Sequence, residues 1–120
     1  MANSDGGNIN TIQKFLFTAS VAFGFALPAQ SELLCPNYGR CVDSAYFTCS
    51  PIGSSFVKRV CYSEQHSYMI LELRSAQYHH CAVDAKTVSA FLAARSKGRF
   101  YRERVSGNFD CALTPPPVLE

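Results

Sequence analysis

Two histidines and a cysteine stand next to one another at His79, His80 and Cys81, and these residue types can bind metal ions or perform catalysis. Imidazole and thiolate both suit zinc, but adjacent residues of a strand point to opposite faces, so only His79 and Cys81 would lie together. No second pair of ligands follows at a metal-binding spacing. We therefore expect no metal ion and no cofactor, and we expect exposed histidines beside a disulfide-bonded cysteine.

A catalytic alternative would combine Cys61 or Cys81 as the nucleophile with His80 as the base. Such a nucleophile needs a free thiolate, a base within hydrogen-bond reach and a third group that orients the base. A cysteine held in a disulfide cannot attack a substrate. The sequence therefore predicts no catalytic residue, and an envelope enzyme or redox protein built on Cys81 and His80 is the less favoured alternative, which requires a free thiol.

A second group of chemically capable residues lies between residues 97 and 104, where basic and aromatic side chains are interleaved. Guanidinium groups bind phosphate and other anions, and aromatic rings stack on flat ligands. Glu103 is the only acidic residue from Lys86 to Arg104, so positive charge gathers here although the whole chain carries only +2. The simpler interpretation is that the rings pack under a sheet and the arginines form an ordinary solvated face. The candidate binding residues, including two from the preceding histidine segment, are Tyr78, His80, Lys97, Arg99, Tyr101, Arg102 and Arg104.

The cellular compartment is indicated by the start of the chain. Lys14 precedes an apolar run over residues 15–27, which has the length of a signal-peptide core and is shorter than the ~20 residues of a transmembrane helix. We expect residues 1–31 to be a signal peptide that is cleaved after Ser31, or alternatively after Ala29. A buried core helix is the competing interpretation. The mature protein is then secreted or periplasmic, with no stable membrane span after cleavage.

All cysteines of the chain follow this leader, and their number is even. An even set of cysteines in an exported chain of this size is typical of a disulfide framework, because a small core needs additional stabilisation. The sequence leaves the pairing open. The residues expected to form disulfides are Cys35, Cys41, Cys49, Cys61, Cys81 and Cys111.

The elements that carry these residues follow from the periodicity of the chain. Residues 32–53 are rich in turn formers and indicate an N-terminal loop held by disulfides. Residues 55–62 are β-branched and aromatic, residues 69–74 alternate with a period of two, and residues 77–83 continue in the same manner. The short connections between these segments require antiparallel pairing. The sequence therefore predicts a three-stranded meander, whose middle strand is half-buried and places Met69, Leu71 and Leu73 on one face.

A helix is predicted after the strands, because Asp84 is a good N-cap and Val88, Phe91 and Leu92 recur at helical spacing. Residues 99–105 are expected to form a second short helical turn, and the tail over residues 112–120 is rich in proline. The expected fold class is α+β: a small three-stranded antiparallel sheet with one or two helices packed on one face and a disulfide-tied N-terminal loop.

The chain resembles a known family in residues 54–111. The resemblance rests on Ser54-Ser55 at the start of a strand, Tyr62 before a polar turn, Tyr78 in the third strand, and the stretch Ser96-Lys97-Gly98-Arg99-Phe100-Tyr101 after a helix. These features are similar to the KTSC domain, which is named for the C-terminal part of some lysyl-tRNA synthetases. The central Tyr-x-Tyr of the family falls on Tyr78-His79-His80, so His80 replaces the second tyrosine.

The resemblance implies no established activity, and RNA binding is suggested for the family through its attachment to a tRNA synthetase. The leader and the cysteines indicate an exported branch, where RNA is scarce. We therefore expect an exported, non-enzymatic interaction or binding module with an anionic polymer or another protein as its partner. RNA or other nucleic-acid binding is the alternative function.

Overall fold

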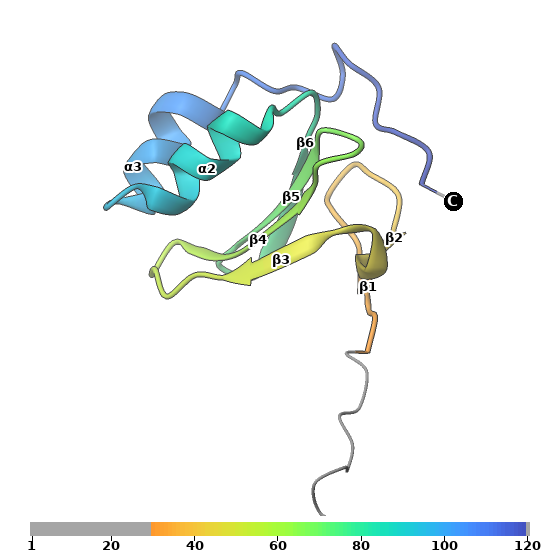
Figure 1. The fold of residues 1–120 in the computed structure, drawn as a ribbon, viewed down its shortest axis with the longest axis horizontal. Helices are drawn as coiled ribbons and strands as arrows, with labels where there is room; N and C mark the ends of the chain where they lie inside the picture. Colours follow the sequence, from red (N-terminus) through yellow and green to blue (C-terminus); the bar gives the residue numbers. More distant parts are fainter. Residues whose placement is uncertain (1–29, 120) are drawn as a thin grey trace, which may run out of the picture. The chain divides into compact units, whose positions relative to one another are not determined.

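The computed structural model describes residues 30–119 (Figure 1). The predicted signal peptide lies almost entirely outside the described residues, so its cleavage stays a prediction. Within residues 30–119, no helix is long and apolar enough to cross a membrane.

The centre of the structure is an antiparallel sheet with four strands in the order of the chain (Figure 1). The strands are β3 (Thr48–Pro51), β4 (Val57–Ser63), β5 (Tyr68–Leu73) and β6 (Ala76–His80). The sequence predicted three of these and assigned the residues of β3 to a loop. Polar and short, β3 has no apolar alternation of its own, and it is held in the sheet by pairing with β4, where Cys49 lies opposite Cys61.

The last strand is shorter than the sequence predicts, because β6 ends at His80 and residues 81–83 leave the sheet. Ala82 has a positive φ of 57°, a conformation that is incompatible with a continuing strand. The backbone N–H of Cys81 donates instead to the carbonyl of Phe109, at 3.0 Å. The sheet therefore gives way to a loop directly after His80.

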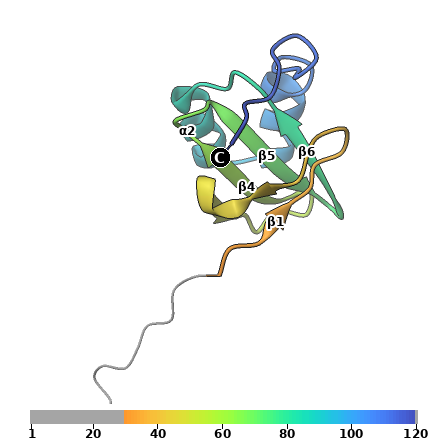
Figure 2. The same cartoon turned by 90° about the vertical axis from the view of Figure 1, so that its right-hand side faces the viewer.

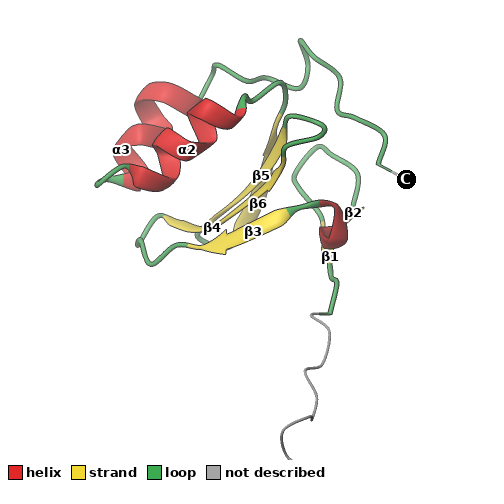
Figure 3. Ribbon diagram, in the orientation of Figure 1, coloured by secondary structure: helices red, strands yellow, loops and turns green. Residues whose placement is uncertain are grey.

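Helices cover one face of the sheet (Figures 1 and 3), as predicted. The chain forms α2 (Ala85–Ala93), α3 (Lys97–Phe100) and a π-helical segment, η2 (Tyr101–Val105), that continues α3. Asp84 caps α2 and Ser96 caps α3, each accepting a hydrogen bond from the backbone N–H three residues later. The predicted helix and second helical turn are therefore both present, and the α+β class is confirmed.

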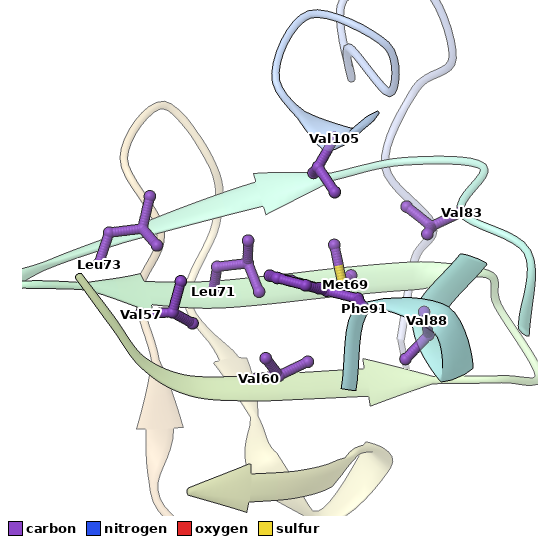
Figure 4. Close-up of a cluster of buried hydrophobic side chains, with 9 residues drawn as sticks. All are labelled: Val57, Val60, Met69, Leu71, Leu73, Val83, Val88, Phe91 and Val105. Atoms are coloured by element: carbon purple, nitrogen blue, oxygen red, sulfur yellow. The ribbon is translucent and has the colours of Figure 1, made fainter. Parts of the chain in front are cut away.

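The first hydrophobic core lies between this face and the helices (Figure 4). Phe91 of α2 is fully buried above the sheet, and its ring stacks on Phe100 of α3 at 5.2 Å between centroids. The alternating residues of β5 point into this core, as predicted. The buried residues of the cluster are Val57, Val60, Met69, Leu71, Leu73, Val83, Val88, Phe91 and Val105.

A second core lies on the opposite face of the sheet, and this was not predicted. Tyr68 and Ile70 of β5 are both 2 % exposed, so the strand is buried on both faces rather than one. Leu34 and Leu119 pack against them from the two ends of the described chain. The N-terminal cover also contains β1 (Leu33–Leu34), β2 (Val42–Asp43) and the 3-10 turn η1 (Ser44–Tyr46), which Figure 2 shows beside the sheet.

The structure contains three disulfides, and all the cysteines of the described residues are paired. Cys35 bonds to Cys41 within the N-terminal loop, and Cys49 bonds to Cys61 across β3 and β4. Cys81 bonds to Cys111 and so ties the end of β6 to the C-terminal segment. The predicted set of bonded cysteines is confirmed, and the structure supplies the pairing that the sequence left open.

Candidate binding surfaces

The candidate binding residues separate into two neighbouring surfaces. Tyr78, His80 and Tyr101 line one open pocket of about 500 Å³, which we call the His80 pocket. The basic candidates do not line this pocket, because they project from α3 and η2 toward solvent or toward α2. From the sequence, the pocket residues and the basic residues were listed together as one set of candidate binding residues.

The strand periodicity explains how the pocket residues meet. Tyr78 and His80 lie two positions apart in β6, so both side chains point to the face that the helices cover. The segment η2 crosses this face and brings the Tyr101 ring to 5.8 Å from the His80 ring, in an edge-to-face arrangement. Tyr101 also packs edge-on against Phe56, again at 5.8 Å between centroids. Aromatic contacts therefore form the inner wall of the pocket.

His80 is buried, whereas the sequence analysis expected it to be exposed. Only 8 % of the residue is accessible to solvent, and its Nε2 atom is buried without a hydrogen-bond partner. Burial lowers the pKa of His80 from its ordinary value of 6.5 to about 4, and the neighbouring His79 contributes in the same direction. The imidazole is consequently neutral at physiological pH and holds an unused hydrogen-bonding position.

His79 points to the other face of β6, as the alternation requires. Its Nδ1 atom lies 2.9 Å from the hydroxyl of Tyr68. Burial raises the pKa of Tyr68 to about 12, so the hydroxyl keeps its proton and remains a partner for the neutral imidazole. Burial also lowers the pKa of His79, against a smaller opposing effect of Asp110. His79 therefore serves the second core, together with the tyrosine.

The cysteines considered as metal ligands or nucleophiles are engaged elsewhere. Cys81, which would have joined His79, is bonded to Cys111, and Cys61 is bonded to Cys49. Among the residues that the structure describes, no three His, Cys, Asp or Glu side chains gather in a way that could hold a metal ion.

The remaining walls of the His80 pocket come from segments that the sequence analysis did not associate with it. Asn37 and Tyr38 belong to the N-terminal loop, which a parallel bridge from Asn37 to Tyr78 holds against β6. Phe109 and Asp110 belong to the loop that follows η2. No lysine or arginine of the described chain lines the pocket. Sequence offered no signal for these walls, because they lie about forty residues before and thirty residues after Tyr78 in the chain.

The basic residues form a second surface on the outer side of α3 and η2. Arg99, Arg102 and Arg104 are exposed. The guanidinium of Arg104 lies over the Phe100 ring at 5.3 Å, and Arg74 lies over the Phe56 ring at 5.5 Å. We call Arg74, Arg99, Arg102 and Arg104 the arginine surface.

Arg74 was missed by the sequence analysis because it stands in the β5–β6 turn, far from the helices in the chain. Gly98 brings Arg102 close to the same ring: a Cβ at Gly98 would lie 3.3 Å from Nη1 of Arg102 and 3.6 Å from Phe56. Two arginines from distant segments thus lie around one aromatic side chain. In residues 30–119 the ion pairs involve Arg59 alone among the basic residues, so no carboxylate, Glu103 included, forms an ion pair with the arginine surface.

Lys97 stabilises the end of a helix and does not belong to the arginine surface. Its Nζ donates to the backbone carbonyl of Ala94, the C-cap residue of α2. A lysine at this position satisfies a terminal carbonyl of the helix and favours the negative end of its dipole. We therefore leave Lys97 out of the candidate contact residues.

Comparison with known proteins identifies the domain that carries both surfaces. The model of the KTSC domain family matches residues 53–109. The chain contains a KTSC domain. A KTSC domain protein from Yersinia pestis, known from a crystal structure, is 25 % identical and superposes with a TM-score of 0.52. The similarity covers 92 % of that chain and 53 % of this one. A comparison with curated proteins finds no significant match.

The KTSC domain of this chain is extended by segments that its disulfides attach. Cys35, Cys41 and Cys49 precede the matched residues and Cys111 follows them. Each disulfide therefore includes at least one cysteine outside the matched region. The segments that cover the second face of the sheet are therefore additions to the domain in this cysteine-rich member. Two walls of the His80 pocket are additions of the same kind.

Proposed function

We propose that this chain is an exported, non-enzymatic binding module that holds an anionic polymer on the arginine surface of its KTSC domain. Three disulfides are consistent with an oxidising compartment, where such bonds form and persist. The observation that carries the proposal is the exposed set of arginines, none of which forms an ion pair with a carboxylate of the described residues.

Aromatic rings orient two of these arginines, Arg74 and Arg104, in the protein without ligand. Arg104 rests on Phe100, which stacks on the buried Phe91, and Arg74 rests on Phe56. A guanidinium held flat on a ring loses less conformational entropy when it binds an anion than a freely rotating side chain does.

The ligand is a polymer with closely spaced carboxylate, sulfate or phosphate groups. An anionic polysaccharide is the form available outside the cytoplasm, whereas RNA is the partner suggested for the family. Both use the same guanidinium contacts, so binding to each polymer distinguishes them. Tighter binding to RNA than to the polysaccharide, at equal salt, would favour the nucleic-acid alternative.

The triple variant Arg99→Gln, Arg102→Gln, Arg104→Gln tests the proposal. Its free energy of unfolding should change by less than about 1 kcal/mol, because exposed charges contribute little to stability. Its binding to an anionic polysaccharide should fall sharply, and the dependence of binding on salt should become less steep, since fewer counterions are released. Titration at several salt concentrations, together with thermal melts, measures both effects.

A matched control removes the same charge elsewhere. Arg40, Lys58 and Lys86 are exposed and lie outside the arginine surface, so their simultaneous replacement by Gln should leave binding nearly unchanged. Equal losses in the two triple variants would mean that only net charge matters and would overturn the proposal. A destabilised first variant with unaltered binding per folded molecule would overturn it as well.

Export is tested on the mature chain itself. If the leader is cleaved after Ser31, N-terminal sequencing of the protein outside the cytoplasm should begin at Glu32. The fold accommodates this end, because the N–H of Glu32 donates to the Ser44 hydroxyl and its carboxylate pairs with Arg59. Intact protein that begins at Met1, recovered from the soluble cytoplasmic fraction, would contradict export.

A further inference from the structure

The His80 pocket lies beside the arginine surface but has different chemistry, and the proposed function makes no use of it. Its volume of about 500 Å³ falls within the range of small-molecule sites in proteins. The walls come from the N-terminal loop, β6 and the loop after η2. The Cys81–Cys111 disulfide fixes one wall, because Cys111 itself lines the pocket. The pocket is thus formed before a ligand enters.

His80 supplies an unsatisfied hydrogen-bonding group in this wall. Its Nε2 is buried and has no partner in the described protein. A buried polar atom without a partner costs about 1–3 kcal/mol, and almost all such atoms in proteins are paired. Because solvent does not reach this nitrogen, a ligand hydroxyl must displace a neighbouring side chain to bond it, and it would then satisfy the imidazole, whichever of its nitrogens carries the proton.

The charge of the pocket excludes an anionic ligand. The imidazole of His80 is neutral, burial also lowers the pKa of His79, the other histidine in the lining, and among residues 30–119 no lysine or arginine contributes to the walls. Asp110 is the one carboxylate in the lining, and it is exposed to solvent and accepts a hydrogen bond from the backbone N–H of Ala112. Because this carboxylate is hydrated and already engaged, it provides little attraction for a cation either.

The other lining groups suit a ring that carries hydroxyls. Tyr78, Tyr101 and Phe109 present aromatic surface, and Tyr38 is 99 % exposed at the rim. Phenol hydroxyls and the amide of Asn37 can both donate and accept hydrogen bonds. A pyranose has apolar C–H faces that pack on aromatic rings and a rim of hydroxyls for such polar groups. We propose that the His80 pocket is a binding site for an uncharged sugar ring, held by the tyrosine rings and by a hydroxyl hydrogen-bonded to His80.

The test uses sugars of one ring type and three charges. Glucose and N-acetylglucosamine are neutral, glucosamine is a cation and glucuronate is an anion. We expect a neutral pyranose to shift the backbone amide NMR signals of residues 78–80 and 107–111 in a saturable manner, and to shift the Nε2 resonance of His80. Glucuronate should bind about tenfold more weakly, because it finds no cation in the pocket.

Substitution of His80 provides a second test of the pocket proposal. His80→Phe keeps a ring of similar size and removes Nε2, so sugar affinity should fall about tenfold for the loss of one buried hydrogen bond. His66→Phe is the matched control, since His66 lies in the β4–β5 turn next to Ser63 and does not line the pocket. If His80→Phe does not fold, the Nε2 shift in the unmodified protein still decides the question.

The outcomes separate this site from the arginine surface. The triple arginine variant should bind the neutral sugar as well as the unmodified protein does, even if it loses the anionic polymer. No saturable shift with any neutral hexose or N-acetylhexosamine well above millimolar concentration would overturn the pocket proposal. Tighter binding of glucosamine than of the neutral sugars would overturn it too, and would indicate an aromatic cage for an ammonium group.

Discussion

The buried imidazole of His80 couples the stability of the domain to pH. The pKa of this group is lowered from 6.5 to about 4, so the unfolded chain binds a proton between these values that the folded chain does not. With respect to this group, the folded state therefore has its full stability above pH 6.5 and loses stability progressively as the pH falls toward 4. We expect the free energy of unfolding to fall by up to about 1.4 kcal/mol per pH unit in this window, as measured by urea denaturation.

The variant His80→Tyr, which carries the tyrosine of the family motif, isolates this effect. Its stability should depend much less on pH between the same two values, because tyrosine does not titrate there. A smaller slope remains, since burial also lowers the pKa of His79. An undiminished slope in His80→Tyr would show that another group is responsible.

At the scale of elements, Gly39 allows the N-terminal loop to lie against β6. A Cβ atom at Gly39 would meet the His79 ring, 2.8 Å from Nδ1, and the Pro36 side chain at 3.0 Å. The ring cannot move away easily without breaking the hydrogen bond between its Nδ1 atom and the Tyr68 hydroxyl. We expect Gly39→Ala to lower the free energy of unfolding by about 1–3 kcal/mol, the usual cost of overpacking, as measured by denaturant midpoints.

Gly53→Ala provides the comparison for Gly39. No atom lies within 4 Å of the position that its Cβ would take, so the substitution introduces no clash. Its effect should stay within about 0.5 kcal/mol in either direction. Equal effects of the two substitutions would mean that the contact of the loop with His79 does not contribute to stability.

At the scale of the whole molecule, two disulfides join the added segments to the KTSC domain, and the third closes the N-terminal loop. Cys81–Cys111 spans 30 residues of sequence, Cys49–Cys61 spans 12 and Cys35–Cys41 spans 6. A larger closed loop restricts the unfolded chain more, so the loss of stability on replacing each pair by alanine should follow this order. The loss should be a few kcal/mol for Cys81–Cys111 and about 1 kcal/mol less for Cys35–Cys41, as measured by thermal denaturation.

Thiol labelling provides the corresponding chemical test. Exported protein that is denatured without reduction should react at no cysteine, because all six are paired. Two or more reactive thiols in properly exported protein would contradict the pairing and would support the catalytic alternative on Cys81 and His80.

The sequence by itself determined the local elements of the KTSC domain. The alternation in β5 places Met69, Leu71 and Leu73 in the first core. The caps at Asp84 and Ser96 mark the beginnings of α2 and α3. These features were predictable because they depend on residues within a few positions of one another, whose periodicity and hydrogen-bonding groups act within a single element. Tyr78, His80 and Tyr101 were named among the candidate binding residues, but only the structure groups them around one pocket.

Only the tertiary structure decided what covers each element. The strand β3 forms through pairing with β4, and Ile70 is buried because the N-terminal segment and the tail cover its face. The burial of His80 likewise depends on η2, and the approach of Gly98 in α3 to Phe56, the ring under Arg74, depends on packing between distant segments. Local pattern shows which side chains can be buried, but the segments that bury them are distant in the chain. Their position is determined by packing and disulfides over the whole molecule.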